Sequence, residues 1–270
     1  MINKEHNKFL YYCAARPFWI VVGYFLHNNP TWAHIRKHCF NFPGQNCHVE
    51  IKKHSKLLFH LNAAYNEYFE FKHRKLPQTE WQKIHWNDYG ETGYKMLEEP
   101  RLNEDFYQYM DDMALKTGRI LEIGCGGFGR TRELAKRYPQ IGFVGYDISN
   151  ESQILYEREI QHQFKNIAYK RANILDEMDA FSLTPFFFTY LVLMHFDPEN
   201  IHGFFHKLSV LDHPVYGILR EPVSETQLSF NYKSRDYKHN YKAYLEKYGF
   251  HLLGSTLTES GMGTFYFKTK

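Results

Sequence analysis

The chain has 270 residues, which is enough to bury a sizeable core as one large domain with an extension. Its composition, 43% hydrophobic and 23% charged, indicates a globular protein, although aromatic residues are unusually abundant at 18%. The net charge of +3 is too small to indicate nucleic acid, although Lys and Arg outnumber acids before residue 85; that basic region either meets an anionic partner or is a solvated face.

The first hundred residues are predicted to be helical. The apolar run from Phe18 to Leu26 is far too short to span a bilayer, and we interpret it as a buried helix or a surface contact. Asn29 and Pro30 predict a helix start that leads through residues 31–38. A long amphipathic helix is predicted from Asn46 to about Lys75, and a further helix over residues 104–116 with Asn103 as its cap.

After Gly118, apolar strands alternate with helical stretches. The predicted strands cover residues 119–124, 141–147, 167–173, 186–193 and 215–220, and the predicted helices cover residues 130–138, 151–164, 198–211 and 239–248. Two last strands, 251–258 and 264–269, are joined too closely to be parallel. We therefore predict an α/β fold with a doubly wound, mostly parallel seven-stranded sheet that ends in an antiparallel hairpin. Residues 1–85 form an N-terminal helical, aromatic-rich extension, and residues 86–270 form the α/β domain.

A glycine-rich loop follows the first predicted strand, in the pattern Gly124-x-Gly126-x-x-Gly129. Glycines there permit a tight turn and close approach of a ligand, while the next helix begins with free N–H groups. Asp147 ends the second strand about twenty residues later, where a carboxylate accepts hydrogen bonds from both ribose hydroxyls. The two features predict adenosine binding.

The same glycine spacing fits a dinucleotide-binding enzyme, and Glu122 is the residue that separates the two interpretations. An acid two residues before the first glycine can meet an ammonium group but would repel a pyrophosphate.

At this point the sequence resembles the class I S-adenosylmethionine-dependent methyltransferases, whose glycine motif is similar to Leu121-Glu-Ile-Gly-Cys-Gly126. The resemblance covers roughly residues 86–270 and implies that S-adenosylmethionine is the cofactor. It implies that Glu122 and the glycine loop hold the methionine part, and that Asp147 binds the ribose. The implied cofactor contacts are Glu122, Gly124, Cys125, Gly126, Gly129, Asp147, Ile148, Asn173, Ile174, Tyr190 and Tyr94.

Three departures from the family pattern indicate a divergent branch. Phe128 occupies the place of the usual third glycine, so the turn is predicted to be one residue longer. The run Pro185–Phe188 replaces an acid at the start of the fourth strand, and Leu211–Pro214 replaces the usual glycine-rich turn before the fifth.

On the acceptor side, His195 follows the fourth strand and is a candidate general base; otherwise it caps or packs beneath the next helix. Arg220 and Glu221, just past the fifth strand, either orient a polar acceptor or form a plain surface ion pair. Tyr89 and Tyr94 lie in a segment whose counterpart in related enzymes folds over the cofactor, so they close the pocket or seal a helix against the core.

The other cluster of chemically active residues is His34, His38, Cys39, Cys47, His48 and His54. Its gaps are irregular and no Cys-x-x-Cys pair is present, so we expect ordinary surface histidines and no metal site. We also expect reduced thiols and a cytoplasmic protein.

Three functions remain open. The first is O-methylation of a small molecule such as a sugar, a phenol or a polyketide-type hydroxyl, and the aromatic abundance would then serve a lid over the acceptor. The second is methylation of tRNA or rRNA, which the basic first 85 residues motivate. The third is a cofactor-binding protein without turnover that acts by association. Nitrogen as the acceptor atom is not excluded.

Overall fold

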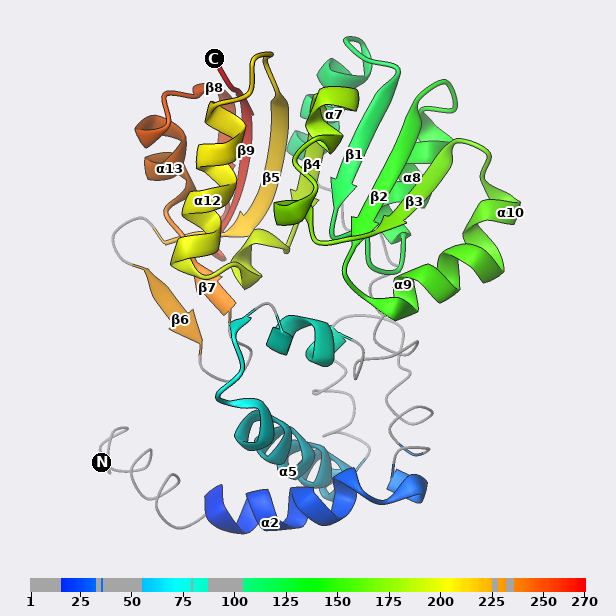
Figure 1. Cartoon of the computed structure of the whole chain (residues 1–270), viewed down its shortest axis with the longest axis vertical. Helices are drawn as coiled ribbons and strands as arrows, with labels where there is room; N and C mark the ends of the chain where they lie inside the picture. The colour runs from blue at the N-terminus through cyan, green and yellow to red at the C-terminus, as the bar shows by residue number, and fades with distance from the viewer. Residues whose placement is uncertain are drawn as a thin grey trace. The chain divides into compact units, whose positions relative to one another are not determined.

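The computed structural model describes residues 16–32, 35, 55–78, 80–86, 104–224, 228–231 and 236–270, and Figure 1 draws them as ribbon. The chain divides into two compact units. The described residues up to Trp81 belong to the first unit, and those from Gln82 onward belong to the second. In this part of the chain no helix is long and apolar enough to cross a membrane.

The first unit contains helices α2 (Arg16–His27) and α5 (Lys56–His73), which pack against each other. They approach closely at Gly23, where a Cβ atom would lie 2.1 Å from the Ala64 carbonyl oxygen. Arg16 Nε donates to Glu67 Oε2 at 2.9 Å and links the two helices a second time. The absence of a side chain at position 23 therefore permits this close approach.

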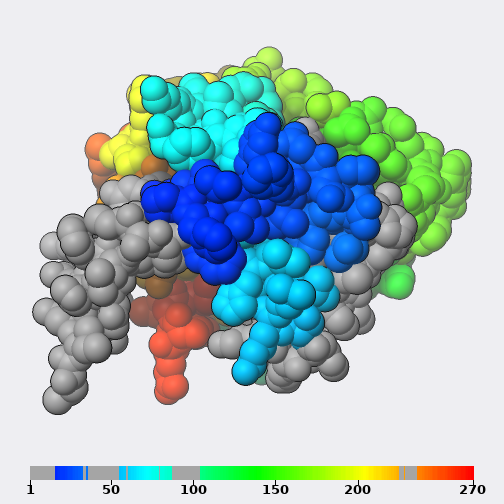
Figure 2. Space-filling model, turned by 90° about the horizontal axis from the view of Figure 1, so that it is seen from below, coloured from blue at the N-terminus to red at the C-terminus, as the bar shows by residue number. Residues whose placement is uncertain are grey.

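The predicted helix over the Phe18–Leu26 run is confirmed, but that helix is not fully buried. Phe18, Val21 and Phe25 are 60%, 57% and 67% exposed, and Figure 2 shows atoms of α2 in dark blue at the surface.

The predicted helix start at Asn29 is also confirmed, because Asn29 Oδ1 accepts a hydrogen bond from the Trp32 backbone N–H at 3.0 Å. The continuous helix from Asn46 to Lys75 is wrong: Ser55 has an extended backbone and caps α5, its Oγ accepting from Leu58 N at 3.2 Å. The predicted start at Asn46 lies outside the described residues. A serine that can cap outweighs the apolar spacing on either side of it.

The second unit is built on a seven-stranded sheet with the order β3-β2-β1-β4-β5-β9-β8. Strands β3, β2, β1, β4 and β5 are parallel, and β9 runs antiparallel between β5 and β8. The strands are β1 (Arg119–Ile123), β2 (Gly142–Asp147), β3 (Ile167–Arg171), β4 (Phe186–Tyr190), β5 (Tyr216–Pro222), β8 (His251–Leu257) and β9 (Met262–Lys268). The predicted mostly parallel sheet with a terminal antiparallel hairpin is confirmed.

Helices cover both faces of this sheet. They are α7 (Glu104–Ala114), α8 (Gly129–Arg137), α9 (Asn150–Leu155), α10 (Gln161–Gln163), α11 (Ala180–Leu183), α12 (Pro198–Ser209) and α13 (Tyr241–Lys247), with a π turn η2 (Tyr156–Ile160) and two 3₁₀ turns, η3 (Ile174–Asp176) and η4 (Leu193–His195). The helix predicted over residues 151–164 is thus interrupted by a π turn.

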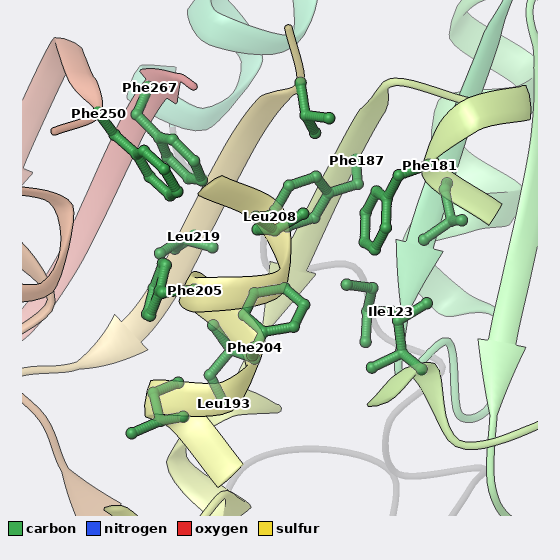
Figure 3. Packing of buried hydrophobic residues seen from close by; sticks show 14 of the residues in the cluster. Ile123, Phe181, Phe187, Leu193, Phe204, Phe205, Leu208, Leu219, Phe250 and Phe267 are labelled. Carbon is green, nitrogen blue, oxygen red and sulfur yellow. The ribbon is translucent and has the colours of Figure 1, made fainter. Parts of the chain in front are cut away.

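The two faces hold two apolar clusters because side chains alternate along each strand. In β4, Phe187 faces the cluster under α11, α12 and α13, whereas Phe186 and Phe188 face the cluster under α7, α8 and α9. Figure 3 shows the first cluster, where Phe187 and Phe204 meet edge to face at 6.0 Å between ring centroids. Much of the aromatic abundance therefore fills the core.

A second, two-stranded sheet was not predicted. Strands β6 (Ser229–Asn231) and β7 (Asp236–Lys238) pair antiparallel in the connection between β5 and α13. Strands of three residues are too short to show an alternating pattern in the sequence.

His239 follows β7 and is fully buried, with Nε2 2.8 Å from the Phe196 carbonyl oxygen. Burial lowers the pKa of His239 from 6.5 to about 4. Because the pKa of His239 is lower in the folded protein than in the unfolded chain, the folded protein has its full stability above pH 6.5. As the pH falls from 6.5 toward 4, the unfolded chain takes up the proton more readily, and the free energy of unfolding decreases.

We predict that this loss amounts to about 3 kcal/mol between pH 7 and pH 4. It should disappear in His239→Gln, which keeps an N–H donor but does not titrate. Urea unfolding of both proteins across this range measures the difference; parallel pH profiles would contradict the assignment.

Candidate active site

The glycine loop forms a tight turn between β1 and α8 that only glycine accommodates at its first position. Gly124 has φ +71°, and a Cβ there would lie 2.3 Å from Val192 Cγ2. Its backbone N–H donates to the Tyr146 carbonyl at 2.7 Å, which ties the loop to the end of β2. Gly126 is also in the left-handed region, with φ +49°. The backbone is thus open to close approach by a ligand.

Phe128, the departure from the family pattern, also has a left-handed backbone, with φ 61°. This conformation is strained for a bulky residue, and packing offsets the strain because the side chain is fully buried. Its ring contacts Tyr156 and Tyr169 at centroid distances of 5.9 and 5.5 Å. Phe128 stands at the N-cap of α8 and gives no side-chain hydrogen bond to the helix. The first turn of α8 is therefore left without a side-chain cap.

Asp147 lies at the carboxyl end of β2 and is brought together with the glycine loop, as its position in the sequence predicts. Asp147 Oδ2 accepts from Gly126 N at 2.9 Å, and Oδ1 accepts from Ser149 N at 2.9 Å. Burial raises the pKa of Asp147, while these backbone hydrogen bonds lower it. Each carboxylate oxygen keeps a second lone pair, so both can still accept from ribose hydroxyls.

Glu122 is fully buried and both its oxygens are engaged. Arg130 Nε donates to Oε1 at 3.2 Å, and Thr131 Oγ donates to Oε2. Burial raises the pKa of Glu122, and the Arg130 charge opposes that shift. Arg130 therefore offsets the charge of this carboxylate, and the repulsion expected between Glu122 and a pyrophosphate stays a prediction.

Tyr190, at the end of β4, lies against the same arginine. The Arg130 guanidinium carbon is 4.6 Å from the centroid of the Tyr190 ring. The ends of β1 and β4 and the start of α8 thus meet at one cluster of side chains.

Two of the implied cofactor contacts, Asn173 and Ile174, follow β3. Asn173 Oδ1 accepts from Leu175 N at 3.1 Å and caps η3, whereas the Ile174 side chain is buried. Ile148 is half-buried beside Asp147, and Cys125 is a buried free thiol packed against Gly145. Their contacts with a cofactor stay predictions.

Glu221 ties the turn after β4 to β5. Its Oε1 accepts from Thr189 Oγ, Val192 N and Leu193 N at 2.8, 3.0 and 3.1 Å, and its Oε2 accepts from Met194 N at 3.2 Å. The carboxylate is fully buried, and burial raises its pKa.

The placement of Arg220 and Glu221 past the fifth strand is wrong, because β5 continues to Pro222 and buries both residues. Arg220 Nη1 donates to Thr264 and lies 3.5 Å from Asp105 Oδ2. Neither residue is in a surface ion pair, and Glu221 is occupied with the backbone. Contact of either with an acceptor stays a prediction.

His195 ends η4, directly after the turn that Glu221 holds. Its Nδ1 lies 2.8 Å from Asp236 Oδ1 on β7, and the Trp86 ring meets its imidazole edge to face at 5.2 Å. Both side chains of the pair are mostly buried, at 15% and 20% exposed. Helix α12 begins after His195, and its N-cap is Asp197. His195 therefore does not cap α12.

The sequence matches no protein-family profile and no curated protein. Among solved structures, an O-methyltransferase family protein from Burkholderia thailandensis has a TM-score of 0.53 at 10% identity, with 89% of this chain and 83% of that chain covered. A protein named LaPhzM has a TM-score of 0.52 at 11% identity, with 83% of this chain and 70% of that chain covered. The chain has the class I methyltransferase fold. At these identities the likeness is one of fold.

In this class I fold, ligands bind beyond the carboxyl ends of the parallel strands. The glycine loop follows β1, Asp147 ends β2 and Tyr190 ends β4, so the geometry gathers these predicted residues at one edge of the sheet.

Sequence reasoning missed Asp236, Arg130 and Thr131. Asp236 lies forty-one residues after His195 in a hairpin that leaves no pattern, so no signal could have found it. Arg130 follows the last glycine directly and was a visible cation beside a predicted acid.

Tyr89, Tyr94 and all six residues of the His/Cys cluster lie outside the described residues. Within the described ranges, no group of three or more His, Cys, Asp or Glu could hold a metal ion.

We predict that Glu221→Gln lowers the free energy of unfolding by about 2 kcal/mol or more, because an amide nitrogen then faces backbone donors and charge-assisted hydrogen bonds are lost. Hydrogen exchange at Val192, Leu193 and Met194 should accelerate.

Glu246→Gln, an exposed change on α13, is the matched control. Unchanged stability and exchange in Glu221→Gln would contradict the role of this carboxylate.

Proposed function

We propose that this chain is an S-adenosylmethionine-dependent methyltransferase that methylates a hydroxyl group of a small molecule. The observation that carries the proposal is the pairing of His195 with Asp236. In this class I fold, the pair belongs to the edge of the sheet at which the glycine loop lies. Oxygen is proposed as the acceptor atom because a hydroxyl nucleophile benefits from a general base such as His195.

The residues present fit the proposed cofactor. Gly124 and Gly126 leave backbone open to the methionine part, and Asp147 keeps acceptor capacity for a ribose. Arg130 adds a cation at the start of α8. When bound, the cofactor supplies a methyl group already activated on a sulfonium, so alignment in a dry pocket provides much of the rate.

His195 is proposed as the general base. Its imidazole would accept the proton of the acceptor hydroxyl as that oxygen takes up the methyl group, and the cofactor, when bound, would supply that methyl group together with a neutral thioether as the leaving group. The histidine becomes a cation at this step, and the Asp236 carboxylate 2.8 Å from Nδ1 stabilises that charge.

Trp86 is proposed to keep water from the histidine. Its ring meets the imidazole edge to face, and its Nε1 donates to Gln82 Oε1 at 2.8 Å, which fixes the ring. A fixed apolar wall strengthens the interaction between His195 and Asp236 by lowering the local dielectric. The N-terminal extension as a substrate cap, with Tyr89 and Tyr94 in a lid, is part of the same proposal.

The cofactor claim is tested by calorimetry with S-adenosylhomocysteine. We expect wild-type protein to bind it, and Asp147→Ala to bind about tenfold to a hundredfold more weakly, because two hydrogen bonds to a charged group are lost. Asp176→Ala, an exposed acid on η3, should bind like wild type. Absence of binding to the wild-type protein would refute the proposed function.

The base assignment is tested with radiolabelled cofactor and a panel of simple phenols and sugars. For any acceptor that is methylated, His195→Ala should lower kcat by about 10²–10⁴-fold with cofactor affinity unchanged. Asp236→Asn should lower kcat less, because the histidine remains.

The exposed His206→Ala on α12 serves as the control for losing a histidine. Turnover of His195→Ala at the wild-type rate would exclude His195 as the base.

A further inference from the structure

Arg130 is a buried cation whose hydrogen-bonding capacity is only partly used. Its side chain is 9% exposed, and Nε donates to Glu122. Neither Nη atom has a hydrogen-bond partner among the described residues. Arg130 Nη1 and Nη2 are not among the fully buried polar atoms without a partner. Both atoms therefore retain some accessible surface.

The guanidinium is held in one orientation by two contacts. Glu122 fixes the Nε edge at 3.2 Å, and the Tyr190 ring lies 4.6 Å from the guanidinium carbon. The forked Nη edge that remains matches the two oxygens of a carboxylate. A group fixed before binding loses little side-chain entropy when the ligand arrives.

The surroundings of Arg130 favour an anion at this place. Arg130 is in the first turn of α8, whose N-cap Phe128 supplies no side-chain acceptor, and the N-terminus of a helix favours negative charge. Glu122 is fully buried behind Arg130 with both oxygens occupied, so a ligand meets the cation first. An ammonium group in direct contact with Glu122 would have to displace Arg130 or Thr131.

We infer that Arg130 binds the carboxylate of the cofactor's methionine part, and that Glu122 is a positioning residue that holds Arg130 for this task. The inference rests on the proposed function and changes its detail: Glu122, expected to meet the ammonium, acts through the arginine instead. Tyr190 serves as the second wall that orients the guanidinium.

Calorimetry with two ligands separates this role from a merely structural one. The ligands are S-adenosylhomocysteine and its decarboxylated analogue, which keeps the amine, the thioether and the adenosine. We expect Arg130→Gln to bind S-adenosylhomocysteine about a hundredfold more weakly than wild type, because a buried charge pair is lost. The same variant should bind the decarboxylated analogue within about threefold of wild type.

Further variants keep the test decisive if the buried Glu122 charge prevents Arg130→Gln from folding. Arg130→Lys keeps the charge that offsets Glu122 but loses the two parallel N–H donors of the guanidinium. It should weaken the binding of S-adenosylhomocysteine about tenfold and leave the binding of the decarboxylated analogue unchanged. Glu122→Gln should likewise weaken the binding of S-adenosylhomocysteine more than the binding of the decarboxylated analogue. Lys136→Gln, an exposed cation lost from the same helix, should change neither affinity.

The possible results lead to distinct conclusions. Equal weakening of both ligands in the Arg130 variants would assign the arginine a structural role and overturn the inference, as would unchanged binding of S-adenosylhomocysteine. Tighter binding of ADP than of S-adenosylhomocysteine by the wild-type protein would indicate that the Nη edge of Arg130 binds a phosphate, and this too would overturn the inference. If wild-type protein binds neither adenosyl ligand, the proposed function itself fails.

Discussion

A fully buried carboxylate has to be compensated where β1 ends, and the arrangement of the site follows from that requirement. Taking the Glu122 charge out of water is costly unless a cation and hydrogen-bond donors surround it. Arg130 and Thr131 from the first turn of α8 meet that need, so the helix is fixed against the strand across the glycine loop. Removing Arg130 would leave the Glu122 charge buried without a cation, which is why this ion pair constrains the fold as well as the site.

A second buried carboxylate organises the acceptor side in the same way. Glu221 gathers three successive backbone N–H groups after β4, and this fixes the turn from which His195 projects toward Asp236. The left-handed Leu191, with φ 59°, is held within the same turn. One acid thus anchors the glycine loop and another anchors the general-base candidate. Between them, at the ends of β1, β2 and β4, lies the edge where a class I fold binds its ligands.

The fold and the cofactor edge were largely predictable because their signals are local. Apolar strands, capped helices and Gly124-x-Gly126-x-x-Gly129 each occupy a few adjacent residues, and strand order then brings Asp147 to the loop. Contacts between distant segments were not predictable. Asp236 reaches His195 from a hairpin of three-residue strands, and the interior position of Glu221 became visible only once β5 was seen to continue to Pro222. The partners of Glu122 were not predictable either, because they depend on how α8 packs.

The proposed methyltransferase function requires that this edge of the sheet bind an adenosyl cofactor. A crystal structure of the protein grown with S-adenosylhomocysteine tests it most directly. We expect electron density for the ligand along the Gly124–Gly129 loop, with both ribose hydroxyls on Asp147 and the carboxylate on the Nη edge of Arg130. Density for the ligand at another place, or the ribose turned away from Asp147, would contradict it.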